Sequence, residues 1–200
     1  MDFDNRPELI EIKGTPWIFA ELMYDSTANV FAENLYAKAG LKKCYAHRDM
    51  LPLLARAEDR LRQENLMLKI CDAYRPGSVQ EIMWNHLPDE RYVAHPAAGS
   101  NHTRGAAIDC VLCDMSGAEL KFPTAVDGYR SDLAGSIRER MDQVLAHMEK
   151  CHPFYQDSGM VQEIKNRDLL RSIMLGAGFE ADDTEWWHFN LPNAADYPLA

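Results

Sequence analysis

The stretch SNHTRGAAID, residues 100–109, places a histidine and an aspartate seven residues apart, with glycine and alanines between them. The apolar run 106–112 predicts a buried strand, and Asp109 lies inside it. A carboxylate in apolar surroundings costs free energy unless it is paired or binds a metal. Asp109 is therefore half of a buried salt bridge, a turn cap or a metal ligand, and His102 is a candidate second ligand.

A second unusual stretch is TEWWHF, residues 184–189, in which Glu185 and His188 stand among aromatic residues. Two histidines and one aspartate from separate strands can bind zinc and leave a fourth position open for water. That is the arrangement of catalytic zinc sites, and Glu185 is close enough in sequence to accept the proton of such a water. The helical HExxH signature of zinc peptidases is absent.

Strand geometry places two demands on such a site. Residues an odd number of positions apart on a regular strand point to opposite faces. Glu185 can therefore serve a metal bound by His188 only if it precedes the regular strand or lies at a bulge. His102 and Asp109 pose the same difficulty, and we expect the necessary bend at Gly105.

The composition predicts one soluble globular domain spanning residues 1–200. Hydrophobic residues make up 46% of the chain and charged residues 26%. The net charge of −10 and the lack of a basic cluster argue against nucleic acid as a partner. The sequence has no basic amphipathic stretch and no run of ~20 apolar residues, so we expect no membrane partner. The N-terminus lacks the pattern of a secretory signal, so we expect a cytoplasmic location.

Five cysteines at irregular spacing predict buried reduced thiols rather than a disulfide framework. Cys110 and Cys113 form a CxxC motif. A lone CxxC is weak support for a zinc or redox site, and in a strand the two side chains would face opposite ways.

Apolar spacing and turn residues predict helices and strands that do not alternate regularly. This pattern is typical of an α+β fold with a mixed or antiparallel central sheet flanked by helices. We expect helices at 49–66, with Asp49 as N-cap, at 77–87, at 131–151, and at 161–179, stopped by Gly176 and Gly178. We expect strands at 66–72, 106–112 and 185–191, and strand and loop at 22–36.

Several motifs together carry a resemblance to a known family. SNHTRGAAID fits SxHxxGxAxD, and EWWH, residues 185–188, fits ExxH, the paired signatures of the zinc D,D-peptidases. CDAYRP at 71–76 and YDSTAN at 24–29 also agree. Over residues 9–191 the chain resembles the D-alanyl-D-alanine dipeptidase (VanX-type zinc D,D-dipeptidase) family. The resemblance implies a zinc D,D-peptidase (hedgehog/D,D-peptidase-like) fold.

Carried over by position, the resemblance implies a role for each motif residue in the reaction. His102, Asp109 and His188 would bind one Zn²⁺ per chain, and Glu185 would be the general base. Arg75 would stabilise the oxyanion that develops at the scissile carbonyl.

The resemblance also implies three residues that contact substrate. Ser100 would line the substrate pocket, and Tyr24 and Asp127 would lie near the amino terminus of the substrate. The setting of Asp127, FPTAVDGY at 122–129, matches the family pattern only loosely.

The implied function is zinc-dependent hydrolysis of the dipeptide D-Ala-D-Ala to two D-alanines. The alternative is a D,D- or L,D-carboxypeptidase that acts on peptidoglycan stem peptides, which would need an open cleft. A metal-binding module without activity is a third possibility, although both Glu185 and Arg75 are present. The expected partner is a small dipeptide, and a homodimer is plausible.

Residues 131–160 depart most from the family pattern, because they form a helical insertion where a shorter connection is usual. Three interpretations remain open. The segment caps the active site and alters substrate entry, builds a dimer interface, or is a plain structural insertion.

Overall fold

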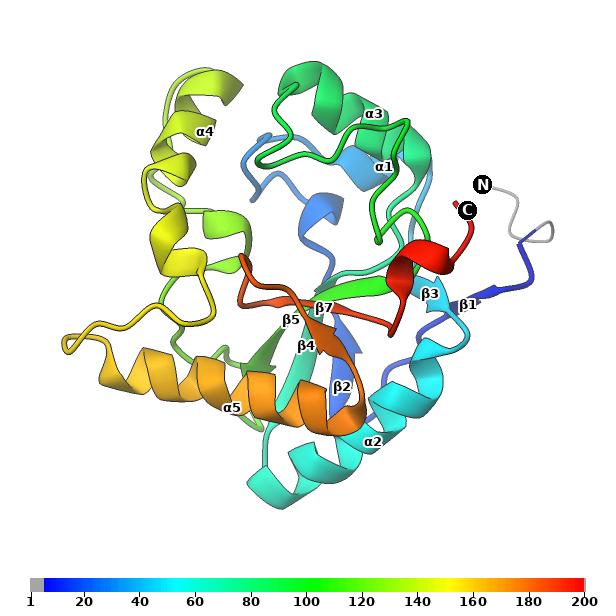
Figure 1. The fold of residues 1–200 in the computed structure, drawn as a ribbon, viewed down its shortest axis with the longest axis vertical. Coiled ribbons are helices and arrows are strands. Elements are labelled where there is room, and N and C mark those ends of the chain that lie inside the picture. Colours follow the sequence, from blue (N-terminus) through cyan, green and yellow to red (C-terminus); the bar gives the residue numbers. More distant parts are fainter. Residues whose placement is uncertain (1–5, 200) are drawn as a thin grey trace.

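The computed structural model describes residues 6–199 and has a five-stranded mixed sheet at its centre (Figure 1). In sheet order the strands are β2 (Ile18–Ala20), β4 (Met67–Asp72), β5 (Ala107–Cys113), β7 (His188–Asn190) and β6 (Glu180–Ala181). β2 runs parallel to β4, and the other neighbours are antiparallel. The predicted α+β class with a mixed central sheet is confirmed.

Two long helices lie side by side below the sheet in Figure 1, α2 (Met50–Glu64) and α5 (Val161–Ala177). Their apolar faces are buried in one cluster with the strands, so both predicted helices are confirmed. Asp49 precedes α2, but its side chain makes no capping hydrogen bond. α5 continues through Gly176 and ends at Gly178, whose φ of 100° is left-handed.

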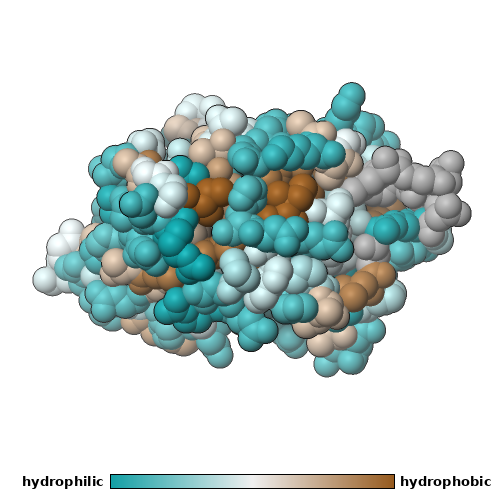
Figure 2. All heavy atoms as spheres, turned by 90° about the horizontal axis from the view of Figure 1, so that it is seen from above, coloured by the Kyte–Doolittle hydropathy of each residue, from teal (hydrophilic) through white to brown (hydrophobic). Residues whose placement is uncertain are grey.

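A second apolar cluster includes residues of three shorter helices, which lie at the top of Figure 1. These are α1 (Leu35–Ala39), α3 (Gly77–His86) and α4 (Ile137–Leu145). The cluster includes Tyr24, Phe31, Met83, Met141 and Val144. Seen from above, apolar atoms show in the middle of a largely hydrophilic face (Figure 2).

A two-stranded ribbon, β1 (Leu9–Glu11) with β3 (Tyr45–His47), lies against the turn that precedes β5. The backbone N–H of His47 donates to the Gly105 carbonyl at 2.8 Å. A Cβ at Gly105 would approach the Leu9 side chain to 2.5 Å, and its φ of 66° is left-handed. Gly105 therefore serves both the bend and the close packing of the ribbon, and the bend expected there is confirmed.

Three predicted elements differ from the structure. The helix predicted at 131–151 is shorter, because a capping box between Ser136 and Glu139 starts α4 and a separate 3₁₀ turn, Met148–Cys151, follows it. The strand predicted at 185–191 begins only at His188. The Asp182 carboxylate accepts the backbone N–H of Thr184 at 2.6 Å and of Glu185 at 3.2 Å, which fixes a turn before β7.

The stretch predicted as strand and loop at 22–36 instead contains a 3₁₀ helix, Met23–Asp25, and the start of α1. Side-chain hydrogen bonds of the buried Asn29 hold the intervening loop together. Such local bonds compete with strand pairing.

All five cysteines are free and buried, as expected. Within residues 6–199, the structure has no helix with the length and apolar character that spanning a membrane requires.

Candidate active site

The pairing of β4, β5 and β7 aligns three polar residues in one row across the sheet. Asp72 lies opposite Asp109, and Asp109 lies opposite His188. Directly opposite residues of antiparallel strands share a face of the sheet. A register shift between Ile70 and Asp72 brings Asp72 into the row. Ordinary strand pairing thus gathers ionisable side chains at the edge of the apolar core.

His102 reaches the same place from the turn before β5. Its Nε2 lies 3.3 Å from His188 Nδ1 and 3.3 Å from Asp109 Oδ2, and His188 Nδ1 lies 2.9 Å from Asp109 Oδ1. Ligands roughly 2 Å from a tetrahedral ion lie roughly 3.3 Å apart. The two imidazole nitrogens and the carboxylate therefore fit one shared metal ion, and all three ligand atoms lie within 4.8 Å of one another.

The outer nitrogens of both histidines are already occupied. His102 Nδ1 lies 2.8 Å from the Ala73 carbonyl oxygen, and His188 Nε2 lies 3.0 Å from Asn190 Oδ1. The Asn101 amide also donates to Asn190 Oδ1, at 2.9 Å. Since both partners are acceptors, these nitrogens carry the protons. In the neutral imidazoles the facing nitrogens then carry the lone pairs that a metal needs, and the outer contacts match those of metal-binding histidines.

The charges of the three residues support the same assignment. Burial opposes ionisation of Asp109, but the imidazoles of His102 and His188 hold the pKa of its carboxyl well below its usual range. Burial also opposes the charged form of His188, yet hydrogen bonding to Asp109 raises the pKa of this imidazole to about 9. The carboxylate thus stays ionised in a buried site, where a cation can replace protons.

Glu185 precedes β7, as the geometry of the site demanded. Its Oε2 lies 4.0 Å from His188 Nδ1, and 27% of its side-chain surface is exposed. Enclosure by the surrounding protein raises the pKa of the Glu185 carboxyl to about 8, although the nearby His188 opposes the rise. A carboxyl tuned upward in this way can exchange a proton near neutral pH.

The two tryptophans of TEWWHF are buried in the core and fix the turn that carries Glu185. Trp186 stacks on Phe122 with ring centroids 4.3 Å apart, and its indole N–H donates to Thr124 Oγ1 at 2.8 Å. Its backbone N–H donates to the Cys151 carbonyl at 3.0 Å. These contacts of Trp186 fix the turn before β7 and thereby the position of Glu185.

Arg75 projects from the end of β4 and is held on several sides. Its Nε and Nη2 donate to Asp72 Oδ2 at 3.0 and 2.6 Å, and its Nη1 donates to Gln80 Oε1 at 3.2 Å. The guanidinium carbon lies 5.1 Å from the centre of the Tyr24 ring. These contacts orient the guanidinium, a planar cation suited to binding oxyanions.

Asp72 is a further residue of the site that was not predicted from the sequence. Its side chain is fully buried and accepts hydrogen bonds from the Tyr36 hydroxyl and from the Ala73 backbone N–H as well as from Arg75. The sequence does contain a pattern that could have identified Asp72. An aspartate that ends an apolar strand needs a partner, and Arg75 follows three residues later.

The opposite wall of the site holds Tyr24 and Asp127. The Tyr24 hydroxyl donates to Asp127 Oδ2, and the Tyr92 hydroxyl donates to the Asp127 carbonyl at 2.9 Å. Burial, with a smaller effect of the Asp109 charge, raises the pKa of the Asp127 carboxyl to about 6. Ser100 lies on the same cavity, with its hydroxyl 3.0 Å from Thr103 Oγ1.

All eight residues selected from the sequence line a single cavity of about 140 Å³. They are Tyr24, Arg75, Ser100, His102, Asp109, Asp127, Glu185 and His188. The sequence analysis missed six further lining residues: Phe31, Gln80, Met83, Tyr92, Val93 and Ala94. Most of these are apolar or aromatic, and the sequence does not separate such residues from ordinary core.

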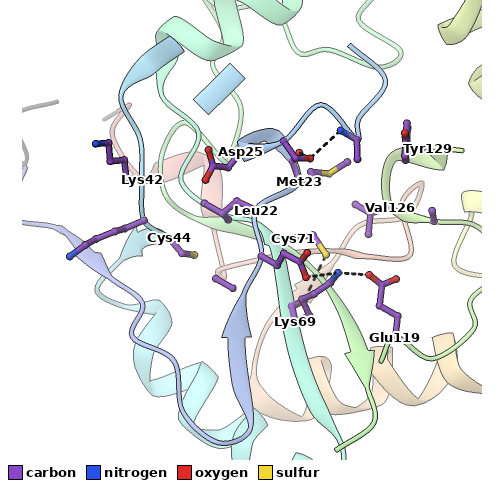
Figure 3. Close-up of a pocket in the computed structure, with 16 residues that line it drawn as sticks. Leu22, Met23, Asp25, Lys42, Cys44, Lys69, Cys71, Glu119, Val126 and Tyr129 are labelled. Atoms are coloured by element: carbon purple, nitrogen blue, oxygen red, sulfur yellow. Dashed lines mark hydrogen bonds and ion pairs between the residues drawn. The ribbon is translucent and has the colours of Figure 1, made fainter. Parts of the chain in front are cut away.

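A larger cavity of about 610 Å³ lies elsewhere and contains none of those eight residues (Figure 3). Its polar lining includes Lys69, which forms ion pairs with Glu21 and Glu119. Among the residues labelled in Figure 3, Met23, Cys71 and Val126 each directly precede a residue of the site. The larger cavity therefore lies next to the walls of the candidate site.

Comparison with known proteins agrees with this geometry. The family model described as D-Ala-D-Ala dipeptidase, peptidase family M15, matches residues 16–199. A D-alanyl-D-alanine dipeptidase of Escherichia coli K12 is 35% identical over 184 residues, which cover 92% of this chain and 84% of the relative.

More distant relatives carry the same name. That of Enterococcus faecium is 30% identical over 171 residues, covering 73% of this chain and 75% of the relative. That of Streptomyces coelicolor is 28% identical over 171 residues, covering 74% of this chain and 76% of the relative. The chain belongs to the M15 peptidase family of D-Ala-D-Ala dipeptidases.

Proposed function

We propose that this chain is a zinc-dependent dipeptidase that hydrolyses D-Ala-D-Ala to two molecules of D-alanine. The observation that carries the proposal is the meeting of eight reactive and polar residues in one small cavity. A metal-binding triad, a carboxyl base, an arginine and a second carboxyl surround a space suited to one small zwitterion. Membership of the dipeptidase family supports the same substrate.

His102, Asp109 and His188 would hold a single zinc ion. With two neutral imidazoles and one carboxylate, a bound zinc keeps net positive charge and supplies a Lewis acid that also makes water more acidic. The buried position of the triad, with Asp109 only 2% exposed, strengthens that effect by excluding bulk solvent.

Glu185 acts as the proton carrier of the reaction. It accepts a proton from the attacking water and later gives this proton to the amine that leaves. Burial raises the pKa of the Glu185 carboxyl to about 8 in the metal-free site, and a bound cation would lower it toward the ionised form that accepts a proton. Glu185 Oε2 lies 4.0 Å from His188 Nδ1, which supports a role for this carboxyl toward a water bound at the triad.

Arg75 stabilises the negative charge that develops on the carbonyl oxygen as water attacks. The pairing with Asp72 and Gln80 fixes the guanidinium before substrate binds, so little reorganisation accompanies the reaction. Asp127, hydrogen bonded to Tyr24, supplies a carboxylate for the substrate ammonium group. Ser100 contributes a hydroxyl to the pocket wall.

The enclosure of the cavity favours a dipeptidase over a D,D- or L,D-carboxypeptidase. A stem peptide needs an open cleft, whereas this cavity is small, about 140 Å³, and its lining includes Phe31, Met83 and Val93, each no more than 3% exposed. A metal-binding module without activity would have no use for a carboxyl base and an oriented arginine. A cytoplasmic location, a single domain at 1–200 and a homodimer stay predictions.

A substrate panel tests the proposal. The zinc-loaded chain is incubated with D,D-, L,D- and L,L-dipeptides beside tripeptides and stem peptides, and release of free amino acids is measured. We expect D-Ala-D-Ala to be hydrolysed fastest and peptides longer than two residues to be spared. Preferential removal of D-Ala from stem peptides would instead establish the carboxypeptidase.

A further inference from the structure

The segment 131–160 contacts the loop that carries Phe31, a residue of the cavity lining. Met141 and Val144 of α4 are buried in the same apolar cluster as Tyr24 and Phe31, both of which line the cavity. Helix α4 therefore packs onto the loop that carries these two aromatic residues.

One side chain of α4 joins the helix to this loop through hydrogen bonds. The Arg140 guanidinium donates from Nε to the Val30 carbonyl at 2.8 Å and from Nη2 to the Phe31 carbonyl at 3.2 Å. Its Nη1 donates to the Gly135 carbonyl at 2.7 Å, which ties the guanidinium to the start of its own segment. A cation that bridges consecutive carbonyls makes charge-assisted bonds and fixes their direction.

The loop has a conformation that needs such support. Ala32, directly after Phe31, has a φ of 54°, in the left-handed region that alanine disfavours. On the inner side, Asn29 accepts the Phe31 backbone N–H at 3.0 Å and donates to the Ser26 carbonyl at 2.8 Å. Phe31 is thus held by Asn29 on one side and by Arg140 on the other.

Phe31 forms part of the wall that encloses the substrate cavity. Its side chain is 1% exposed, and its ring centroid lies 6.3 Å from that of Tyr24. Since Tyr24 is bonded to Asp127, Phe31 stands on the side of the cavity that would receive the amino-terminal residue of a dipeptide. Movement of the Phe31 backbone would enlarge the space for this residue.

We propose that Arg140 is a positioning residue that fixes Phe31 and thereby sets the size limit for the first residue of the substrate. The segment 131–160 then has the role of a brace on the closed site. This inference rests on the proposed dipeptidase function for its substrates and on the Arg140 contacts for its mechanism.

Steady-state kinetics of Arg140→Ala test the proposal, with D-Ala-D-Ala and D-Leu-D-Ala as substrates. We expect KM for D-Ala-D-Ala to rise about tenfold while kcat changes by less than about threefold, because uniform binding is lost. The ratio of kcat/KM for D-Leu-D-Ala to that for D-Ala-D-Ala should rise about tenfold. Arg140→Lys keeps the charge and should restore part of the wild-type selectivity.

Arg138→Ala is the matched control, because Arg138 lies on the same helix, is exposed, and among residues 6–199 forms one ion pair, with Asp89 at 3.9 Å. It should leave both KM and selectivity unchanged. If Arg140→Ala keeps the wild-type selectivity while folded, or if Arg138→Ala shifts it equally, the positioning role is wrong.

A measurement without substrate separates this inference from the proposed function. Amide hydrogen exchange of residues 26–34 should quicken in Arg140→Ala and stay at the wild-type rate in Arg138→Ala. Unchanged exchange in folded Arg140→Ala overturns the brace, even if the wild type cleaves D-Ala-D-Ala. A wild type that cleaves no dipeptide overturns the dipeptidase, whatever the exchange result.

Phe31→Ala covers the case in which Arg140→Ala does not fold. It removes the side chain that lines the cavity and leaves the residues of α4 unchanged. The ratio of kcat/KM for D-Leu-D-Ala to that for D-Ala-D-Ala should rise as it does in Arg140→Ala. Unaltered selectivity in Phe31→Ala would contradict the role of Phe31 as the size limit.

Discussion

The two walls of the catalytic cavity are built in different ways. On one wall, Asp72, Asp109 and His188 stand in a row that strand pairing alone sets up. On the other, Tyr24 and Asp127 lie in short 3₁₀ turns and Phe31 in a loop. Asp127 itself has a φ of 56°, which is left-handed.

This difference shows how the molecule divides its work. Asp109 and His188 are carried on hydrogen-bonded strands, which hold their spacing. Arg75, His102 and Glu185 lie in the short segments just before or after these strands. The groups proposed to recognise substrate are carried on turns, which depend on side-chain bonds from distant segments, such as those of Tyr92 and Arg140. Changes on the sheet wall should therefore remove activity, whereas changes on the turn wall should tune it.

Asp109→Ala should have the largest effect, because it removes the carboxylate at the centre of the row. We expect loss of bound zinc, loss of detectable turnover, and loss of the rise in melting temperature that zinc gives the wild type. Metal analysis and thermal unfolding with and without zinc check these outcomes. Asp59→Ala, on the exposed side of α2, is the control. Retention of tightly bound zinc by Asp109→Ala would break the account of the sheet wall.

Glu185→Gln comes next, since it removes the base and leaves the ligands in place. Turnover should fall about 10²–10⁴-fold, with metal content unchanged. Glu180→Gln, an exposed substitution in β6, should keep wild-type turnover. A variant Glu185→Gln that turns over at the wild-type rate would show that another group accepts the proton.

The different construction of the walls also explains what could be predicted from the sequence. Asp109 and His188 are ionisable groups within apolar or aromatic runs, so each is conspicuous. Strand parity required Glu185 to precede the regular strand or lie at a bulge, and the structure has the first of these. The bend expected at Gly105 is also present. The resemblance to the dipeptidase family added Arg75, Ser100, Tyr24 and Asp127, all of which line the same cavity.

The remainder depends on tertiary contacts that leave no local signal. In the sequence, Phe31 cannot be told from an ordinary core residue. Its position at the cavity depends on hydrogen bonds from Asn29 and from Arg140, which is more than a hundred positions away. The start of the helix in 131–151 and the turn at 22–36 are likewise set by a capping box and by side-chain hydrogen bonds that periodicity does not show.

Arg75→Lys tests the comparison between the two walls where they meet, because Arg75 follows β4 and its guanidinium lies over the Tyr24 ring. Lysine keeps the charge but cannot hold both Asp72 and Gln80 in a planar fork. We expect kcat to fall about 10²-fold with zinc content intact. Kinetics and metal analysis on one preparation check this. Wild-type kcat in Arg75→Lys would mean that orientation of the guanidinium is unimportant.

Asp127→Asn should have the smallest effect on turnover and a measurable effect on stability. The pKa of Asp127 in the folded protein, about 6, lies above the usual value of 3.8 for an aspartate. Between these values the folded state binds more protons than the unfolded state, so rising pH lowers the free energy of unfolding. Asparagine removes this term. The variant should therefore gain stability relative to the wild type between pH 4 and 7, by roughly 1–3 kcal/mol.

Urea unfolding of both proteins at pH 4 and pH 7 measures that gain, and KM for D-Ala-D-Ala should rise in the variant because the substrate ammonium loses its counter-charge. An equal stability difference at the two pH values would show that Asp127 is ionised in the folded protein throughout this range.

The most direct test of the central claim, that His102, Asp109 and His188 form one catalytic metal site, is a zinc titration of the metal-free chain. Bound zinc and hydrolysis of D-Ala-D-Ala are measured on the same samples as zinc is added. The account predicts that both rise together and saturate at about one zinc per chain. Full activity in the metal-free chain, or activity that keeps rising after the triad is filled, would contradict it.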